Sequence, residues 1–62
     1  MLQITTNYKV DSDRFGHWLR AHGGELVGCD SNENNGEYML IVRAGTIDAK
    51  LLQFAMDVFK EQ

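Results

Sequence analysis

Residues 35–43, which read Asn-Gly-Glu-Tyr-Met-Leu-Ile-Val-Arg, decide the fold of this 62-residue chain. The Asn35-Gly36 pair is a strong signal for a tight hairpin turn, because both residue types tolerate the positive φ angles that such turns require. The apolar run 38–42 that follows shows no alternation with polar residues, which is typical of a central strand. We therefore expect a hairpin whose second strand, residues 37–43, lies in the middle of a sheet.

Two further strands are expected beside this one. Residues 25–30 precede the turn and form the first arm of the hairpin, but Glu25 and Gly28 suit an edge strand better than a central one. Residues 2–6 alternate apolar and polar side chains, as a half-buried strand does. The order of the segments then predicts that residues 2–6 and residues 25–30 flank the central strand.

A first helix is predicted after residue 11. Asp11, Ser12 and Asp13 are good N-cap and first-turn residues, and Gly23-Gly24 ends the helical pattern. One face of this helix combines apolar and aromatic side chains with a histidine: Phe15, Trp18, Leu19 and His22. Gly16 lies beside that face, where a small residue lets another helix approach closely.

A second helix is predicted near the C-terminus, with Thr46 as its N-cap. Nearly half of its circumference is apolar, in two adjoining flanks. The first flank contains Ile47, Leu51, Phe54 and Val58, and the second contains Leu52, Met56 and Phe59. We expect one flank to cover the sheet and the other to meet the first helix.

The element order β-α-β-β-α predicts an α+β fold with two layers in one domain, residues 1–62. The expected sheet has three antiparallel strands in the order 2-3-1, with both helices on one face. This arrangement is similar in element order to a ferredoxin-like fold that lacks its last strand, but it contains no motif from which residues or activity could be transferred. The missing strand would leave the edge formed by residues 2–6 open to pairing.

The overall composition restricts the compartment and the partners. Six basic and nine acidic residues give a net charge of −3, which disfavours binding to nucleic acid or to a membrane surface. Cys29 is the only cysteine, so no intramolecular disulfide can form, and we expect a reducing cytoplasm. No signal peptide and no apolar run of membrane-spanning length is apparent. Cys29 itself is expected to be a buried small side chain within its strand.

The residue types needed for metal binding and catalysis do not occur at suitable spacings. His17 and His22 lie about 140° apart around the predicted helix, too far to share one metal ion. Asp30, Asn32 and Asn34 place oxygen atoms at alternate positions, yet the glycine and the closing glutamate of a calcium loop are missing. We therefore expect no catalytic residue, no cofactor and no metal, and we expect His22 to interact with free carbonyl groups at its helix end.

The strand after the turn superficially resembles the strand motif of RNA-recognition domains, where aromatic side chains at alternate positions stack on bases. Here those positions hold Glu37, Met39 and Ile41, and residues 2–6 offer no aromatic ring. Without stacking rings or a basic groove, this face is not expected to bind single-stranded nucleic acid.

The acidic residues are concentrated in one part of the chain. Residues 21–42 contain no lysine or arginine but contain Glu25, Asp30, Glu33 and Glu37, so this segment has a formal charge of −4 and the rest of the chain +1. A solvated loop is the simplest interpretation. The more specific interpretation is an acidic finger that docks on a basic protein surface.

Our leading hypothesis from the sequence is a non-enzymatic protein-binding module. It would be an inhibitor, adaptor or antitoxin of the kind that phages and other mobile elements encode, and it would occupy a basic partner surface through the acidic hairpin or the open edge at residues 2–6. The candidate protein-binding residues are Glu25, Asp30, Glu33, Glu37, Arg14, Trp18 and Arg43. A homodimer could form through Leu2, Ile4, Leu52, Met56 and Phe59.

Two alternatives belong to other classes of function. The chain could be a small nucleic-acid-associated regulator whose basic residues are Lys9, Arg14, Arg20 and Arg43, although Arg14 and Arg20 lie about 120° apart on the predicted helix. It could also be a small ligand-binding protein or an enzyme subunit, which would require a pocket.

Overall fold

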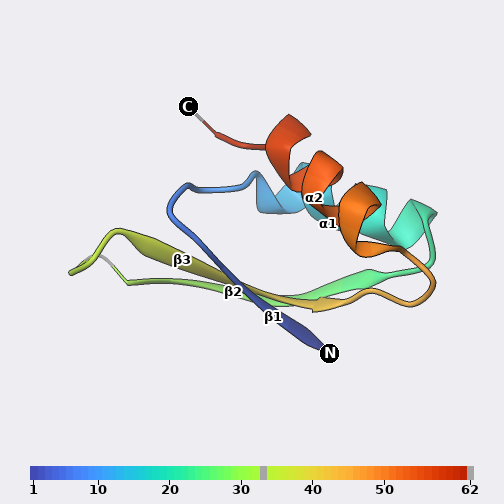
Figure 1. Ribbon diagram of the computed structural model, residues 1–62, viewed down its shortest axis with the longest axis horizontal. Helices are drawn as coiled ribbons and strands as arrows, with labels where there is room; N and C mark the ends of the chain where they lie inside the picture. The colour runs from blue at the N-terminus through green and yellow to red at the C-terminus, as the bar shows by residue number, and fades with distance from the viewer. Residues whose placement is uncertain (33, 62) are drawn as a thin grey trace.

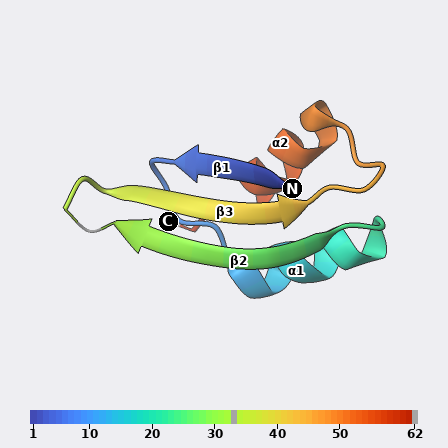
Figure 2. The same cartoon turned by 90° about the horizontal axis from the view of Figure 1, so that it is seen from below.

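A computed structural model describes residues 1–32 and 34–61 of the chain. The elements in chain order are β1 (Leu2–Thr6), α1 (Ser12–Ala21), β2 (Glu25–Asn32), β3 (Glu37–Arg43) and α2 (Ala49–Val58). The strands form one sheet in the order β1-β3-β2, and both pairings are antiparallel. Both helices cover the same face of the sheet (Figure 1 and Figure 2). The predicted α+β layout is therefore confirmed.

The hairpin is longer than the sequence suggested. Asn32 pairs with Glu37, so β2 continues to the turn, which includes residues 34–36. Side-chain amides support it: Asn32 Oδ1 accepts a hydrogen bond from the N–H of Asn34 at 3.1 Å, and Asn35 Oδ1 accepts one from the N–H of Glu37 at 3.0 Å. Gly36 has a φ of +70°, a conformation that glycine adopts more readily than any other residue. These local bonds stabilise a turn that extends beyond the helices (Figure 1).

The hydrophobic core lies between the sheet and the two helices. Buried side chains from β3, both helices and the segment before α1 meet there: Val10, Phe15, Leu19, Leu40, Val42, Leu52, Ala55 and Met56. Gly16 is also buried, and a Cβ atom at this position would lie 3.9 Å from Cβ of Leu26. The small residue thus faces strand β2, whereas the sequence pattern had suggested a neighbouring helix.

Both ends of α1 follow the sequence prediction. Asp11 is the N-cap, and its Oδ1 accepts a hydrogen bond from the N–H of Arg14 at 3.2 Å. His22 is the C-cap, with its ring Nδ1 2.8 Å from the carbonyl oxygen of Trp18. The predicted interaction of His22 with the helix-end carbonyls is confirmed. Gly23 follows with a φ of +87°, which reverses the chain into β2.

The predicted start of α2 at Thr46 is wrong. The N-cap is Asp48, whose Oδ1 accepts a hydrogen bond from the N–H of Leu51 at 2.7 Å. Gly45 has a φ of +61°, and the N–H of Ile47 donates to the carbonyl oxygen of Ala44 at 3.0 Å. This turn follows β3 directly and delays the helix by two residues, because a residue inside the turn cannot cap it.

The two apolar flanks of α2 have different environments. Leu52 and Met56 are buried, with 4% and 2% of their surfaces exposed, and the small Ala55 lies beside them in the core. Leu51, Phe54 and Val58 are exposed at 39%, 61% and 56%. The Leu52 flank therefore faces the core. Of the other flank, Leu51, Phe54 and Val58 face solvent, whereas Ile47, which precedes the helix, packs against the core.

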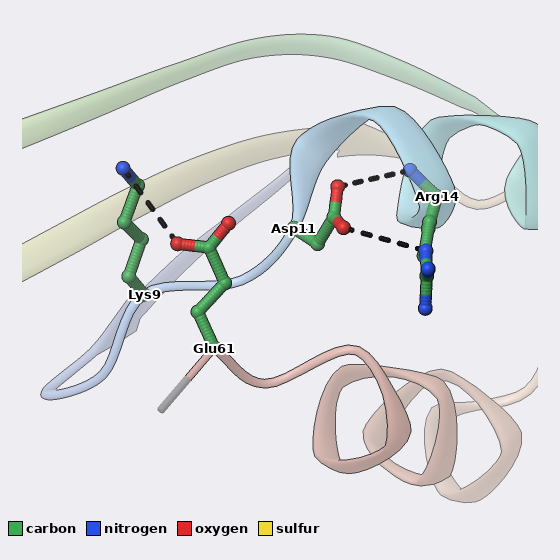
Figure 3. Close-up of polar contacts among 4 residues, drawn as sticks. All are labelled: Lys9, Asp11, Arg14 and Glu61. Atoms are coloured by element: carbon green, nitrogen blue, oxygen red, sulfur yellow. Dashed lines mark hydrogen bonds and ion pairs between the residues drawn. The ribbon is translucent and has the colours of Figure 1, made fainter.

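The end of α2 is fastened to the segment that precedes α1. The N–H of Asp11 donates to the carbonyl oxygen of Phe59 at 2.8 Å, and the N–H of Glu61 donates to that of Lys9 at 2.8 Å. Lys9 Nζ also lies 3.7 Å from Glu61 Oε2 (Figure 3). These contacts place the N-terminal end of α1 beside the C-terminal end of α2, so the two helices run antiparallel.

Candidate protein-interaction surface

The face of the sheet opposite the helices is open among the described residues (Figure 2). Leu40 and Val42 of β3 are buried on the helix side, so their neighbours Glu37, Met39 and Ile41 point to the open side. The predicted frame of alternating residues is thus confirmed. Ile41 is 36% exposed and Met39 is half-buried, so the middle of this face is apolar.

Polar side chains surround this apolar centre. Gln3 and Thr5 of β1 lie opposite Ile41 and Met39 in the register, and both are exposed. On the other side, Asp30 of β2 lies opposite Met39 and is exposed. We call the side chains of Gln3, Thr5, Asp30, Glu37, Met39 and Ile41 the open sheet face.

The acidic end of the open sheet face is at the hairpin. Asp30 and Glu37 are exposed, and Asn32 lies opposite Glu37 in the register. An open hollow of about 590 Å³ at this end is lined by these side chains together with Thr5 and Met39. The candidate residue Glu33 lies outside the described residues. The hairpin thus offers carboxylates and amides in a shallow depression that adjoins apolar surface.

Glu25 and Arg43, both candidates from the sequence, lie at the other end of the sheet. They are paired in the register of β2 and β3, and Arg43 Nη2 lies 3.2 Å from Glu25 Oε2. Glu25 is therefore partly neutralised within the molecule and does not belong to the acidic hairpin end. The sequence had grouped it with the hairpin because the pairing partner was not known.

Arg14 and Trp18 lie in the helix layer, on the opposite side of the molecule from the open sheet face. Arg14 Nε is 3.6 Å from Asp11 Oδ2 (Figure 3). Trp18 is half-buried and stacks between Phe15, at a ring-centroid distance of 6.4 Å, and His22, at 4.1 Å. The six candidate binding residues that the structure describes therefore do not form one surface.

The candidate dimerisation residues do not form one surface either. Leu52 and Met56 were predicted to lie in a dimer surface, and this prediction is corrected. The side of α2 that carries them faces the core, so both side chains are buried and cannot contact a partner. Phe59 is half-buried against Phe15, at a ring-centroid distance of 6.4 Å. Ile4 packs against the core, and Leu2 is 45% exposed on β1. β1 pairs with β3 alone among the described strands, so its outer edge is open.

Cys29 is exposed, and its predicted burial is wrong. The register pairs it with Leu40, which places it on the helix side of β2. It lines an open hollow together with Lys9 and Ser12, at the start of α1, where the hairpin extends away from the helices. The cause of the error is that α1 covers only part of β2.

Within residues 1–32 and 34–61, no group of three or more histidine, cysteine, aspartate or glutamate side chains is placed to hold a metal ion.

The basic residues of the nucleic-acid alternative are distributed over the molecule. Lys9, Arg14 and Arg43 each form an ion pair with a carboxylate. The first pair joins the segment before α1 to the segment after α2, the second lies at the start of α1, and the third lies at the far end of the sheet. Arg20 is exposed in the last turn of α1. No observation on the described part of the chain favours that alternative.

The open sheet face includes residues that sequence reasoning did not select. The sequence pattern places Met39 and Ile41 on one face of their strand, but it does not bring Gln3 and Thr5 beside them. The two-residue alternation of a strand shows which of its side chains share a face, and it can be read from the sequence. The register that brings residues of different strands together cannot.

No family model, curated protein or solved structure matches the chain. None of the helices in the described ranges is long and apolar enough to cross a membrane.

Proposed function

We propose that this chain is a non-enzymatic protein-binding module that acts by occupying a partner's surface with its open sheet face. The observation that supports this most directly is the exposure of Met39 and Ile41 beside the acidic pair Asp30 and Glu37. An apolar centre with polar residues around it is the usual anatomy of a protein–protein interface. Inhibitor, adaptor and antitoxin roles all use such a surface, since each requires only that another protein be covered.

The proposed partner has a basic surface with an apolar contact near it. Residues 21–42 contain no lysine or arginine that could neutralise Asp30 and Glu37 locally, and the nearest acidic residue on β2, Glu25, is already paired with Arg43. Unneutralised carboxylates at one end of a binding face accelerate association with a basic partner and orient it. The apolar residues then contribute affinity by excluding water.

We place this module in the cytoplasm. Its one cysteine, Cys29, has an exposed thiol, which a reducing compartment keeps unmodified.

Affinity capture with matched variants tests the proposal. The bait is the wild-type chain, and two further baits have Met39→Ser or Glu37→Lys in the open sheet face. The control bait has Asp13→Lys, which changes the net charge as much as Glu37→Lys but lies on exposed surface of α1. We expect a partner that the wild type and the Asp13 variant retain and that both open-face variants lose. A partner retained equally by all four baits would exclude the open sheet face.

A further inference from the structure

A second apolar surface lies on the outer side of α2, away from the open sheet face. Leu51, Phe54 and Val58 are exposed at 39%, 61% and 56%, and at 100° per residue they lie within about 60° of one another. We call these three residues the α2 stripe. The stripe faces away from the sheet, and α2 forms the outer layer of the molecule there (Figure 1). Its apolar side chains contribute nothing to the described core, so intramolecular packing does not account for them.

Two charged residues border the α2 stripe in an arrangement that does not stabilise the helix itself. Lys50 lies in the first turn of α2 and Asp57 in the last turn, and both are exposed. A helix is stabilised by acidic residues in its first turn and basic residues in its last turn, so both charges oppose the helix dipole. Neither takes part in an ion pair among the described residues, where the three pairs involve Lys9, Arg14 and Arg43. Asp57 accepts only a hydrogen bond from Gln53 Nε2, at 3.1 Å.

The positions of these charges suit a second copy of the same helix. Lys50 and Asp57 lie within about 20° of each other on one flank of the stripe, next to Phe54. When two identical helices pack antiparallel, like flanks face each other, as the outer positions of antiparallel coiled coils do. A two-fold axis at Phe54 then brings Lys50 of each copy within one residue position of Asp57 of the other, about 1.5 Å along the helix. The same axis brings Leu51 of each copy within one position of Val58 of the other, so that apolar residues meet apolar residues.

We propose that two copies of this chain associate through antiparallel packing of their α2 stripes about a two-fold axis at Phe54. Every contact away from the axis occurs twice in such an isologous interface, which compensates for the short helix. The complementary charges indicate that the partner is a second copy of this chain in the antiparallel orientation. Parallel packing would place the charged flank of one helix against the opposite, uncharged flank of the other. The open sheet face lies on the other side of the molecule and stays accessible, so this association is independent of the proposed function.

Sedimentation equilibrium over a range of concentrations tests the association. We expect the wild-type chain to be a dimer at the upper end of the range and Phe54→Ser to weaken dimerisation about 100-fold or more, since two phenyl rings lose their burial. The variant should fold, because Phe54 is 61% exposed in the single chain; far-ultraviolet circular dichroism checks this. A wild-type chain that is monomeric at about 1 mM would overturn the proposal.

Charge reversal tests the orientation. Lys50→Asp and Asp57→Lys each place like charges opposite each other in the homodimer, and each should weaken it about tenfold. Both substitutions improve the helix dipole interaction, so loss of folding is not expected to obscure the result. A mixture of the two variants restores both opposite-charge pairs, and we expect a heterodimer about as stable as the wild-type dimer. Asp13→Lys, on α1, is the control and should leave dimerisation unchanged. Mixing that restores nothing would contradict antiparallel packing of α2.

Discussion

Arg43 Nη2 lies 3.2 Å from Glu25 Oε2, across the paired ends of β2 and β3. The contact separates the acidic residues of the hairpin strands into two groups, since Glu25 forms an ion pair whereas Asp30 and Glu37 form none within residues 1–32 and 34–61. The charge that remains available to a partner is therefore at the turn end of the sheet. Counting charges along the sequence could not distinguish these groups.

This pair is expected to matter little for folding. Both side chains are more than half exposed, and an exposed ion pair contributes about 0.2–1 kcal/mol. Glu25→Gln should thus lower the free energy of unfolding by less than about 1 kcal/mol in urea denaturation and should leave partner binding unchanged. Loss of partner binding in Glu25→Gln would show that the interface reaches the far end of the sheet.

The assignment of faces on β3 predicts opposite outcomes for adjacent residues. Leu40 is 4% exposed in the core, whereas Ile41 is 36% exposed on the open sheet face. Leu40→Ala should destabilise the fold by about 2–5 kcal/mol because it leaves a cavity. Ile41→Ala should cost clearly less in the same urea titration while weakening partner binding. Equal destabilisation by the two substitutions would contradict the open face.

The start of α2 can be tested by removing each possible cap. Asp48→Ala should lower stability by about 0.5–2 kcal/mol, because the N–H of Leu51 loses its acceptor. Thr46→Ala should change stability by less than about 0.5 kcal/mol, because Thr46 is exposed and precedes the helix. Thermal unfolding followed by circular dichroism measures both, and a larger effect at Thr46 would support the start first predicted.

The thiol of Cys29 provides a direct check of burial. Because it is exposed in the folded chain, it should react with a chromogenic disulfide reagent under native conditions within about tenfold of its rate in denaturant. A rate that is suppressed by several orders of magnitude would indicate the buried position that the sequence suggested.

Much of the fold follows from local sequence signals. The apolar run of β3 and the Asn35-Gly36 turn predict the central strand and the hairpin, while Asp11 and Gly23 predict the ends of α1. These signals depend on only a few neighbouring residues, so they can be recognised in the sequence alone.

The wrong predictions concern places where two residues, or two faces of a helix, suit the same role about equally well. Thr46 and Asp48 are both good caps, and the turn at Gly45 decides between them. The Leu51 and Leu52 flanks are similarly apolar, and the choice depends on which of them lets α2 approach the sheet with Ala55 inside. Only tertiary packing determines that rotation.

The candidate site was less predictable than the fold. The acidic hairpin was recognisable from composition, but its relation to Met39, Ile41 and Thr5 depends on strand register. Register is a long-range property, and a shift by one residue would reverse every side chain between the two faces.

The open sheet face is tested most directly by titrating the isotopically labelled chain with its captured partner and following the amide chemical shifts. We predict the largest shifts and line broadening at Thr5, Asp30, Glu37, Met39 and Ile41, together with loss of binding in Met39→Ser and a weaker salt dependence in Glu37→Lys. Shifts confined to α1 and α2, with the open sheet face unperturbed, would contradict the proposed function.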